Sequence, residues 1–182
     1  MDVTLPPDPW QKVMTYHDLP ADEVISALQK EVRRGHTDNA CRLAYELIQT
    51  SPELEEKLWI RLMVISVEDV GFGNTQAPVL VKALYDMHEK FSLGALDRPL
   101  FAIHAVRFLC KSEKDRSSDE LINWIKQNDT LPEIPDYAID MHTKRGQEMG
   151  RDIKHFYDEA SKVDPEKKNR NTSYREKLLK ML

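Results

Sequence analysis

Apolar residues recur at helical spacing along most of this 182-residue chain. The most continuously apolar stretch begins at Leu58 and ends at Ser66, with Trp59 near its start. A helix that is apolar around most of its circumference lies at the centre of a fold, so we expect Trp59 to be buried. No stretch alternates apolar and polar residues as a half-buried strand does. The pattern predicts an all-α protein built as a multi-helix bundle.

Residues that start and stop helices delimit the other elements. The first helix is expected from Pro20 to Arg34, with acidic residues near its start and Gly35 as its stop. Later helices are expected to begin close to Thr37, Ser51, Pro78, Asp97 and Ser117. Ser117 and Glu120 are spaced as a capping box for the last of these, with the Ser117 side chain as the cap. Short connections between the first three helices predict antiparallel neighbours.

The same pattern divides the chain into four parts. They are an extended N-terminal arm (1–19), a helical domain (20–163), a charged linker (164–172) and a short C-terminal amphipathic helix (173–182). The arm is rich in proline, and Trp10 and Tyr16 are expected to anchor it to the core. A helix as short as the last one is marginal alone, so we expect it to dock on its own domain or on another subunit.

The central helix ends in an acidic turn, defined here as Glu68, Asp69 and Gly71. A helix C-terminus carries partial negative charge, so two carboxylates there destabilise the fold unless a cation or backbone N–H groups compensate them. The acidic turn is therefore predicted to have a structural, intramolecular partner, with Arg61 or Arg107 as candidates. A ligand-binding or metal-binding role is the alternative.

A second polar region lies between residues 136 and 163. It contains a candidate polar site, the histidine block, defined as Asp140, His142 and His155. Because Asp140 and His142 are two residues apart they do not share a helix face, and the HExxH spacing is missing, so no metal site is predicted. The basic residues of this region are candidate phosphate or nucleic-acid contacts, against the alternative of a solvated surface: Lys144, Arg145, Arg151 and Lys154.

Composition narrows the classes of function. A net charge of −5 argues against binding of nucleic acid or anionic membranes by the whole surface, although it leaves room for a local basic patch. Cys41 and Cys110 lie in apolar patterns without a CxxC partner, which favours buried free thiols in a reducing compartment. No apolar run approaches the roughly 18 residues of a membrane span, and the N-terminus lacks signal-peptide features. We expect a cytoplasmic protein without membrane contact.

Three segments carry a family resemblance: EVISALQKEVRRGHTDNA (23–40), VEDVGFGN (67–74) and DMHTKRGQEMGR (140–151). Together they resemble the C-terminal region of the bacterial replication-associated recombination proteins, which are AAA+ ATPases of the Werner-helicase-interacting type. The matching residues are Ala27, Leu28, Arg33, Gly35, Asp38, Ala40, Glu68, Asp69, Gly71, Glu148, Met149 and Gly150. The chain departs from the family pattern at Gln147, in a loop at 110–114 without the usual proline, and in an ending reduced to His155 and Phe156.

The resemblance implies an all-helical module that follows the ATPase core, is similar to the collar domains of clamp loaders, and carries tetramerisation. It therefore implies a homo-oligomer, a tetramer, with replication or repair proteins as partners. These 182 residues contain no GxxxxGK[ST] phosphate loop, so we expect a chain that stands alone without the ATPase core, with no cofactor and no catalytic residues.

Three functions follow as hypotheses. The first is a non-catalytic oligomerisation or scaffold module in DNA replication, recombination or repair. The second is a small enzyme that uses the acidic turn with Asp140 and His142 as acid, base or metal ligands, which requires these groups to converge in one pocket. The third is a DNA-binding module that contacts phosphates through the basic residues near the histidine block.

Overall fold

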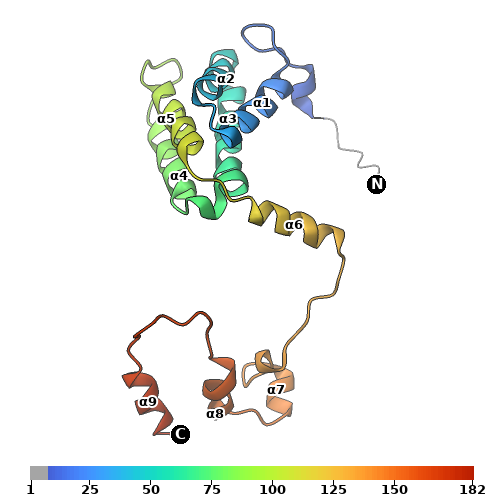
Figure 1. Cartoon of the computed structure of the whole chain (residues 1–182), viewed down its shortest axis with the longest axis vertical. Coiled ribbons are helices and arrows are strands. Elements are labelled where there is room, and N and C mark those ends of the chain that lie inside the picture. The colour runs from blue at the N-terminus through green and yellow to red at the C-terminus, as the bar shows by residue number, and fades with distance from the viewer. Residues whose placement is uncertain (1–7) are drawn as a thin grey trace. The chain divides into compact units, whose positions relative to one another are not determined.

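The computed structural model describes residues 8–182, and every regular element within them is helical (Figure 1). Within these residues, Met14 and Pro20 form an isolated antiparallel β-bridge that is not part of a strand. The predicted all-α multi-helix fold is therefore confirmed. The chain forms two compact units, with the boundary between Asn128 and Asp129. Each unit is described by itself.

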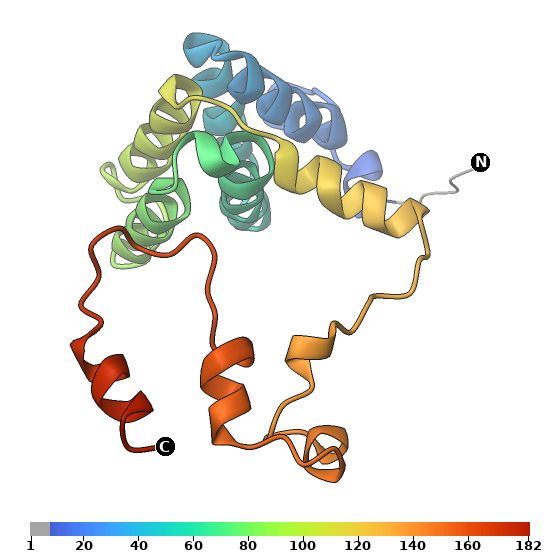
Figure 2. The same ribbon diagram turned by 60° about the horizontal axis from the view of Figure 1, so that its bottom comes forward.

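The first unit is a helical bundle from which the last helix extends away (Figures 1 and 2). The helices are α1 (Ala21–Arg34), α2 (Thr37–Thr50), α3 (Pro52–Ile65), α4 (Ala77–His88), α5 (Arg98–Lys111) and α6 (Ser117–Gln127). Helix α2 packs against α1, α3 and α5, and α4 packs against α5. As predicted, Gly35 ends α1 in the left-handed conformation with φ 75°.

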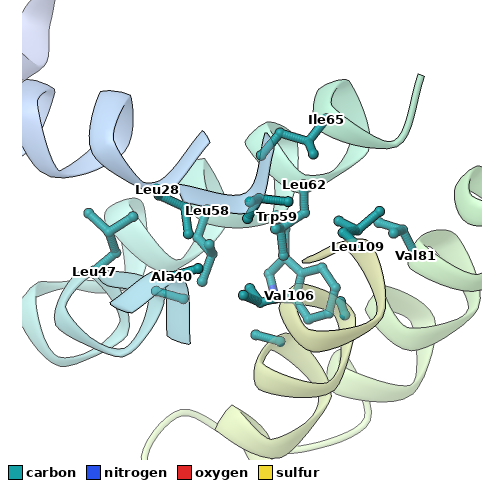
Figure 3. Close-up of a cluster of buried hydrophobic side chains, with 14 of the residues drawn as sticks. Leu28, Ala40, Leu47, Leu58, Trp59, Leu62, Ile65, Val81, Val106 and Leu109 are labelled. Carbon is teal, nitrogen blue, oxygen red and sulfur yellow. The ribbon is translucent and has the colours of Figure 1, made fainter. Parts of the chain in front are cut away.

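The core of this unit surrounds α3 (Figure 3). Trp59 is fully buried, as predicted, with Val106 of α5 beside it, and Leu28 of α1 belongs to the same cluster. The burial follows from the sequence pattern, because α3 presents apolar residues on most of its surface and is covered by helices on several sides.

The segment before α1 differs from the predicted extended arm. It contains a short 3₁₀ helix, η1 (Pro9–Lys12), and then reverses direction at Asp18, which adopts φ 57°. Trp10 is half-buried against the core, whereas Tyr16 is 63% exposed and is tied to α2 through its backbone N–H, which donates to Thr50 Oγ1 at 3.0 Å. Backbone hydrogen bonds across the reversal, such as Thr15 N–H to Leu19 O at 2.8 Å, make the compact form favourable. The first seven residues of the predicted arm lie outside the described residues.

The second unit contains short helices joined by irregular segments. They are η4 (Asp136–Ala138), α7 (Lys144–Glu148), α8 (Ile153–His155), η5 (Phe156–Ala160) and α9 (Ser173–Leu179). The predicted helical domain over 20–163 is thus divided, because residues 129–134 are exposed and non-helical around Pro132. Residues 164–172 are non-helical, and α9 lies within the predicted C-terminal helix. No helix in residues 8–182 has the combined length and apolarity that crossing a membrane requires.

Candidate functional site

The acidic turn lies where α3 widens into a π-helical turn, η2 (Ser66–Val70). The side chain of Asp69 is fully buried, and that of Glu68 is 24% exposed. Gly71 follows with φ 50° and donates its N–H to the carbonyl of Ser66. A π-turn of this kind is often found at functional positions in helices. This turn places one buried and one half-buried carboxylate at a helix C-terminus, where the negative end of the helix dipole destabilises them.

Two arginines and a glutamine compensate these carboxylates. Arg33 on α1 donates from Nε to Asp69 and from Nη2 to Glu68, the latter at 3.2 Å. Arg116, which precedes α6, donates from Nη1 to Asp69 Oδ1 at 2.6 Å and to Glu68 Oε1 at 3.2 Å. The Gln29 amide nitrogen lies 2.8 Å from Glu68 Oε1 and 2.9 Å from Asp69 Oδ2. We call these five residues the acid–arginine cluster. It joins α1, η2 and the start of α6.

These contacts show that the prediction of Arg61 or Arg107 as the partner of the acidic turn is wrong. Arg61 donates to the side-chain oxygen Oε1 of Gln29 at 3.1 Å, so it orients that amide with its nitrogen toward the carboxylates but does not reach them itself. Arg107 is exposed on α5 and is absent from the hydrogen bonds of the acidic turn. The sequence could have identified Gln29 as a candidate partner, because it is a polar residue on the otherwise apolar face of α1. The loop that holds Arg116 has no periodicity from which to place it.

Arg116 also connects the acidic turn to α6. Its Nη2 pairs with Asp119 in the first turn of α6. Burial lowers the pKa of Arg116, but hydrogen bonds to Asp69 and Glu68 outweigh burial and raise that pKa above its ordinary value. Asp115 accepts the Ser117 N–H at 2.9 Å just before the helix, and the N-cap is Arg116, so the predicted cap by the Ser117 side chain is wrong. The start of α6 is therefore held on the bundle by charged hydrogen bonds.

Two glycines allow the loop before α6 to lie directly on the turn. A Cβ atom at Gly71 would lie 2.3 Å from the carbonyl oxygen of Asp115, and one at Gly73 would lie 2.6 Å from that of Glu113. In return, the Asp115 N–H donates to the carbonyl of Asp69 at 3.1 Å. Gly71 is therefore needed both for its positive φ and for this close approach.

Replacing Gly71 by Ala is expected to lower the free energy of unfolding by about 2 kcal/mol, because the new Cβ adds a backbone clash to an unfavourable φ. Gly94→Ala is the matched control, since Gly94 has φ 80° but a Cβ there meets no described atom within 4 Å. That control is expected to cost only about 1 kcal/mol. Urea denaturation followed by circular dichroism measures both, and equal losses would contradict the role given to the close approach.

The histidine block belongs to the second unit, where Asp140 and His142 form a local turn. Asp140 accepts the His142 backbone N–H at 2.9 Å and lies 3.0 Å from its ring Nδ1. The hydrogen bond from the His142 side chain lowers the pKa of Asp140, and the one from its backbone adds to this. The His142 ring lies edge-on to Phe156, with centroids 5.2 Å apart. His155 lies in α8 and is half-buried.

Three of the four predicted basic contacts have acidic partners within the same unit. Arg151 Nη2 lies 2.6 Å from both carboxylate oxygens of Asp136, and this hydrogen bonding lowers the pKa of Asp136. Lys144 and Lys154 each pair with an acidic residue four positions later in the chain. Arg145 is exposed. Because Arg151 also donates to two backbone carbonyls, its guanidinium serves the local fold.

Neither polar region has the donor set of a metal centre. In the part of the chain that the structure describes, no group of three or more His, Cys, Asp or Glu side chains is arranged to hold a metal ion. Cys41 and Cys110 are free thiols whose pKa values are raised by burial, which makes both less reactive. The acidic turn and the histidine block fall in different units.

The first unit is thus an all-helical bundle whose acidic turn forms an internal ion-pair cluster. The chain is 31% identical over 154 residues, 81% of its length, to replication-associated recombination protein A of Bacillus subtilis (strain 168). It spans about a third of that protein, 35% of its length. No family model matches the chain. It is a partial relative of the replication-associated recombination proteins.

Proposed function

We propose that this chain is a non-catalytic assembly module in DNA replication, recombination or repair, which forms homo-oligomers and serves as a scaffold. The name of the similar Bacillus subtilis protein supports the process, since it refers to replication and recombination. The proposed partners are replication or repair proteins. A collar-like tetramer, corresponding to the C-terminal region of such ATPases, is the form that the sequence resemblance implies.

The observation that carries the proposal is the uncovered apolar face of α6. Leu121, Ile122, Trp124 and Ile125 are 55%, 44%, 61% and 50% exposed. Figures 1 and 2 show α6 extending away from the other helices of its unit. Contiguous apolar surface of this kind marks interaction sites, because a monomer gains nothing from exposing it.

The acid–arginine cluster supports a holding role over a catalytic one. Both Asp69 oxygens and one Glu68 oxygen accept hydrogen bonds from Arg33, Arg116 or Gln29. Because these carboxylate oxygens are already occupied by charge-assisted hydrogen bonds within the protein, they are not free to accept a proton from a substrate. In our proposal the cluster fixes the direction in which α6 leaves the bundle.

Size-exclusion chromatography with light scattering tests the proposal. At high micromolar concentration the mass is expected to exceed the 21.2 kDa of one chain, and to fall toward it on dilution. A mass of one chain at every concentration would overturn the proposal.

A further inference from the structure

We propose that the apolar face of α6 pairs with α6 of a second copy of this chain, antiparallel and around a two-fold axis. The inference rests on the proposed function, because it requires a homo-oligomer. The occupant of the exposed face is thus the same helix in another subunit, which makes the contact isologous.

The spacing of α6 residues defines a single apolar face. At about 100° per residue, Leu121 and Ile125 lie at the centre of this face, with Ile122 and Trp124 at its two sides. Asn123 lies on the opposite side of the helix. Every residue from 120 to 127 is exposed, so the first unit leaves the whole face uncovered.

Charges on the edges of the face select the antiparallel orientation. Asp119 and Lys126 are seven residues apart, which is close to two turns, so they lie on the same edge. Glu120 lies on the other edge. In an antiparallel pair like edges meet, so Asp119, which also pairs with Arg116 of its own chain, faces Lys126 of the second copy, and the same contact forms twice. A parallel pair would instead place Asp119 beside Glu120 of the second copy, which repels.

This charge pairing also determines the register. With Asp119 opposite Lys126, the two-fold axis passes between Ile122 and Asn123. Leu121 then lies opposite Trp124 of the second copy, and the large aromatic ring is buried against an aliphatic side chain. The ion pairs and the apolar contacts between the two helices therefore form in the same register, as is expected of a specific interface.

The surface beside the start of α6 extends the contact area. Two hollows of about 230 and 220 Å³ are both lined by Val67 and Ser118. In the proposed register the C-terminal end of the second α6 reaches the level of Ser118. Val67 and Phe72, which are 50% and 72% exposed, add apolar surface there. The addition matters because an 11-residue helix pair alone is small compared with the roughly 1,000 Å² of a stable interface.

Light scattering and sedimentation of surface variants test the face. Leu121→Asp and Lys126→Glu are each expected to weaken association at least tenfold, or to reduce a tetramer to dimers if a second contact exists. Leu100→Asp is the matched control, because Leu100 is a 63% exposed helical leucine on α5. It is expected to leave the mass unchanged. Far-ultraviolet circular dichroism spectra equal to that of the parent show that all three variants keep the fold.

Cysteine cross-linking tests the orientation. Ile122→Cys lies beside the two-fold axis and is expected to form a disulfide with its counterpart when treated with diamide. Ile125→Cys lies on the same face, but in an antiparallel pair its counterpart is displaced by about 7 Å along the helix, beyond easy disulfide reach. The parent protein, treated in the same way, measures any cross-linking through its own free cysteines, Cys41 and Cys110. Equal cross-linking of the two variants would overturn the antiparallel pair.

Failure of this inference is distinct from failure of the proposed function. An oligomer whose mass is unchanged by Leu121→Asp and Lys126→Glu overturns the α6 contact and leaves the assembly role in place. A parent protein that remains a single chain at every concentration overturns both.

Discussion

Replacing Trp59 by Ala is expected to lower the free energy of unfolding by roughly 3–5 kcal/mol, because it leaves a cavity at the centre of the first unit. Trp59 is fully buried on α3, and its ring lies 5.5 Å from Tyr85 and 5.0 Å from His88, measured between centroids. Figure 3 places Val106 of α5 next to it. Urea denaturation followed by far-ultraviolet circular dichroism measures the change.

Trp59→Phe is the control for cavity size. It retains an aromatic ring and removes the indole Nε1, which is buried without a hydrogen-bond partner among residues 8–182. The loss is therefore expected to be less than half of that for Ala. A loss below about 1 kcal/mol for the Ala variant would show that α3 is peripheral, since surface substitutions have effects of that order or less.

Replacing Asp69 by Asn is expected to lower the free energy of unfolding by roughly 2–3 kcal/mol. The change keeps the shape of the side chain but removes the charge that Arg33 and Arg116 bind, and hydrogen bonds to charged groups are worth more than neutral ones. Glu68→Gln is the comparison. Because Glu68 is 24% exposed and water can replace its partners, its loss is expected to be about 1 kcal/mol.

A second measurement separates this role from a catalytic one. Since Arg116 binds both Asp69 and the first turn of α6, Asp69→Asn is expected to speed amide hydrogen exchange at the start of α6 and to leave exchange in α5 unchanged. Functional carboxylates are often held at a cost to the fold, so catalytic residues would give variants as stable as the parent or more stable. Two variants of unchanged stability would therefore contradict the structural role.

Local sequence determined the helices and the centre of the core. Apolar periodicity located α3 and the burial of Trp59, and Gly35 marked the end of α1, because both depend on residues only a few positions apart. The same reasoning recognised that two carboxylates at the end of α3 need compensation. It did not recognise the compact reversal before α1, whose hydrogen bonds form between residues that carry no turn-specific pattern.

Tertiary structure alone decided which residues meet and which remain uncovered. The partners of Asp69 are 36 and 47 residues away in the chain, and Arg33 and Arg116 reach it because of how α1 and the loop before α6 pack on α3, so spacing within one helix could not identify them. The apolar stripe of α6 was likewise visible in the sequence, where such a stripe normally predicts burial. That the stripe is exposed depends on the direction in which α6 leaves the bundle, and in our proposal this direction is set by the contacts of Arg116 with the acidic turn and Asp119.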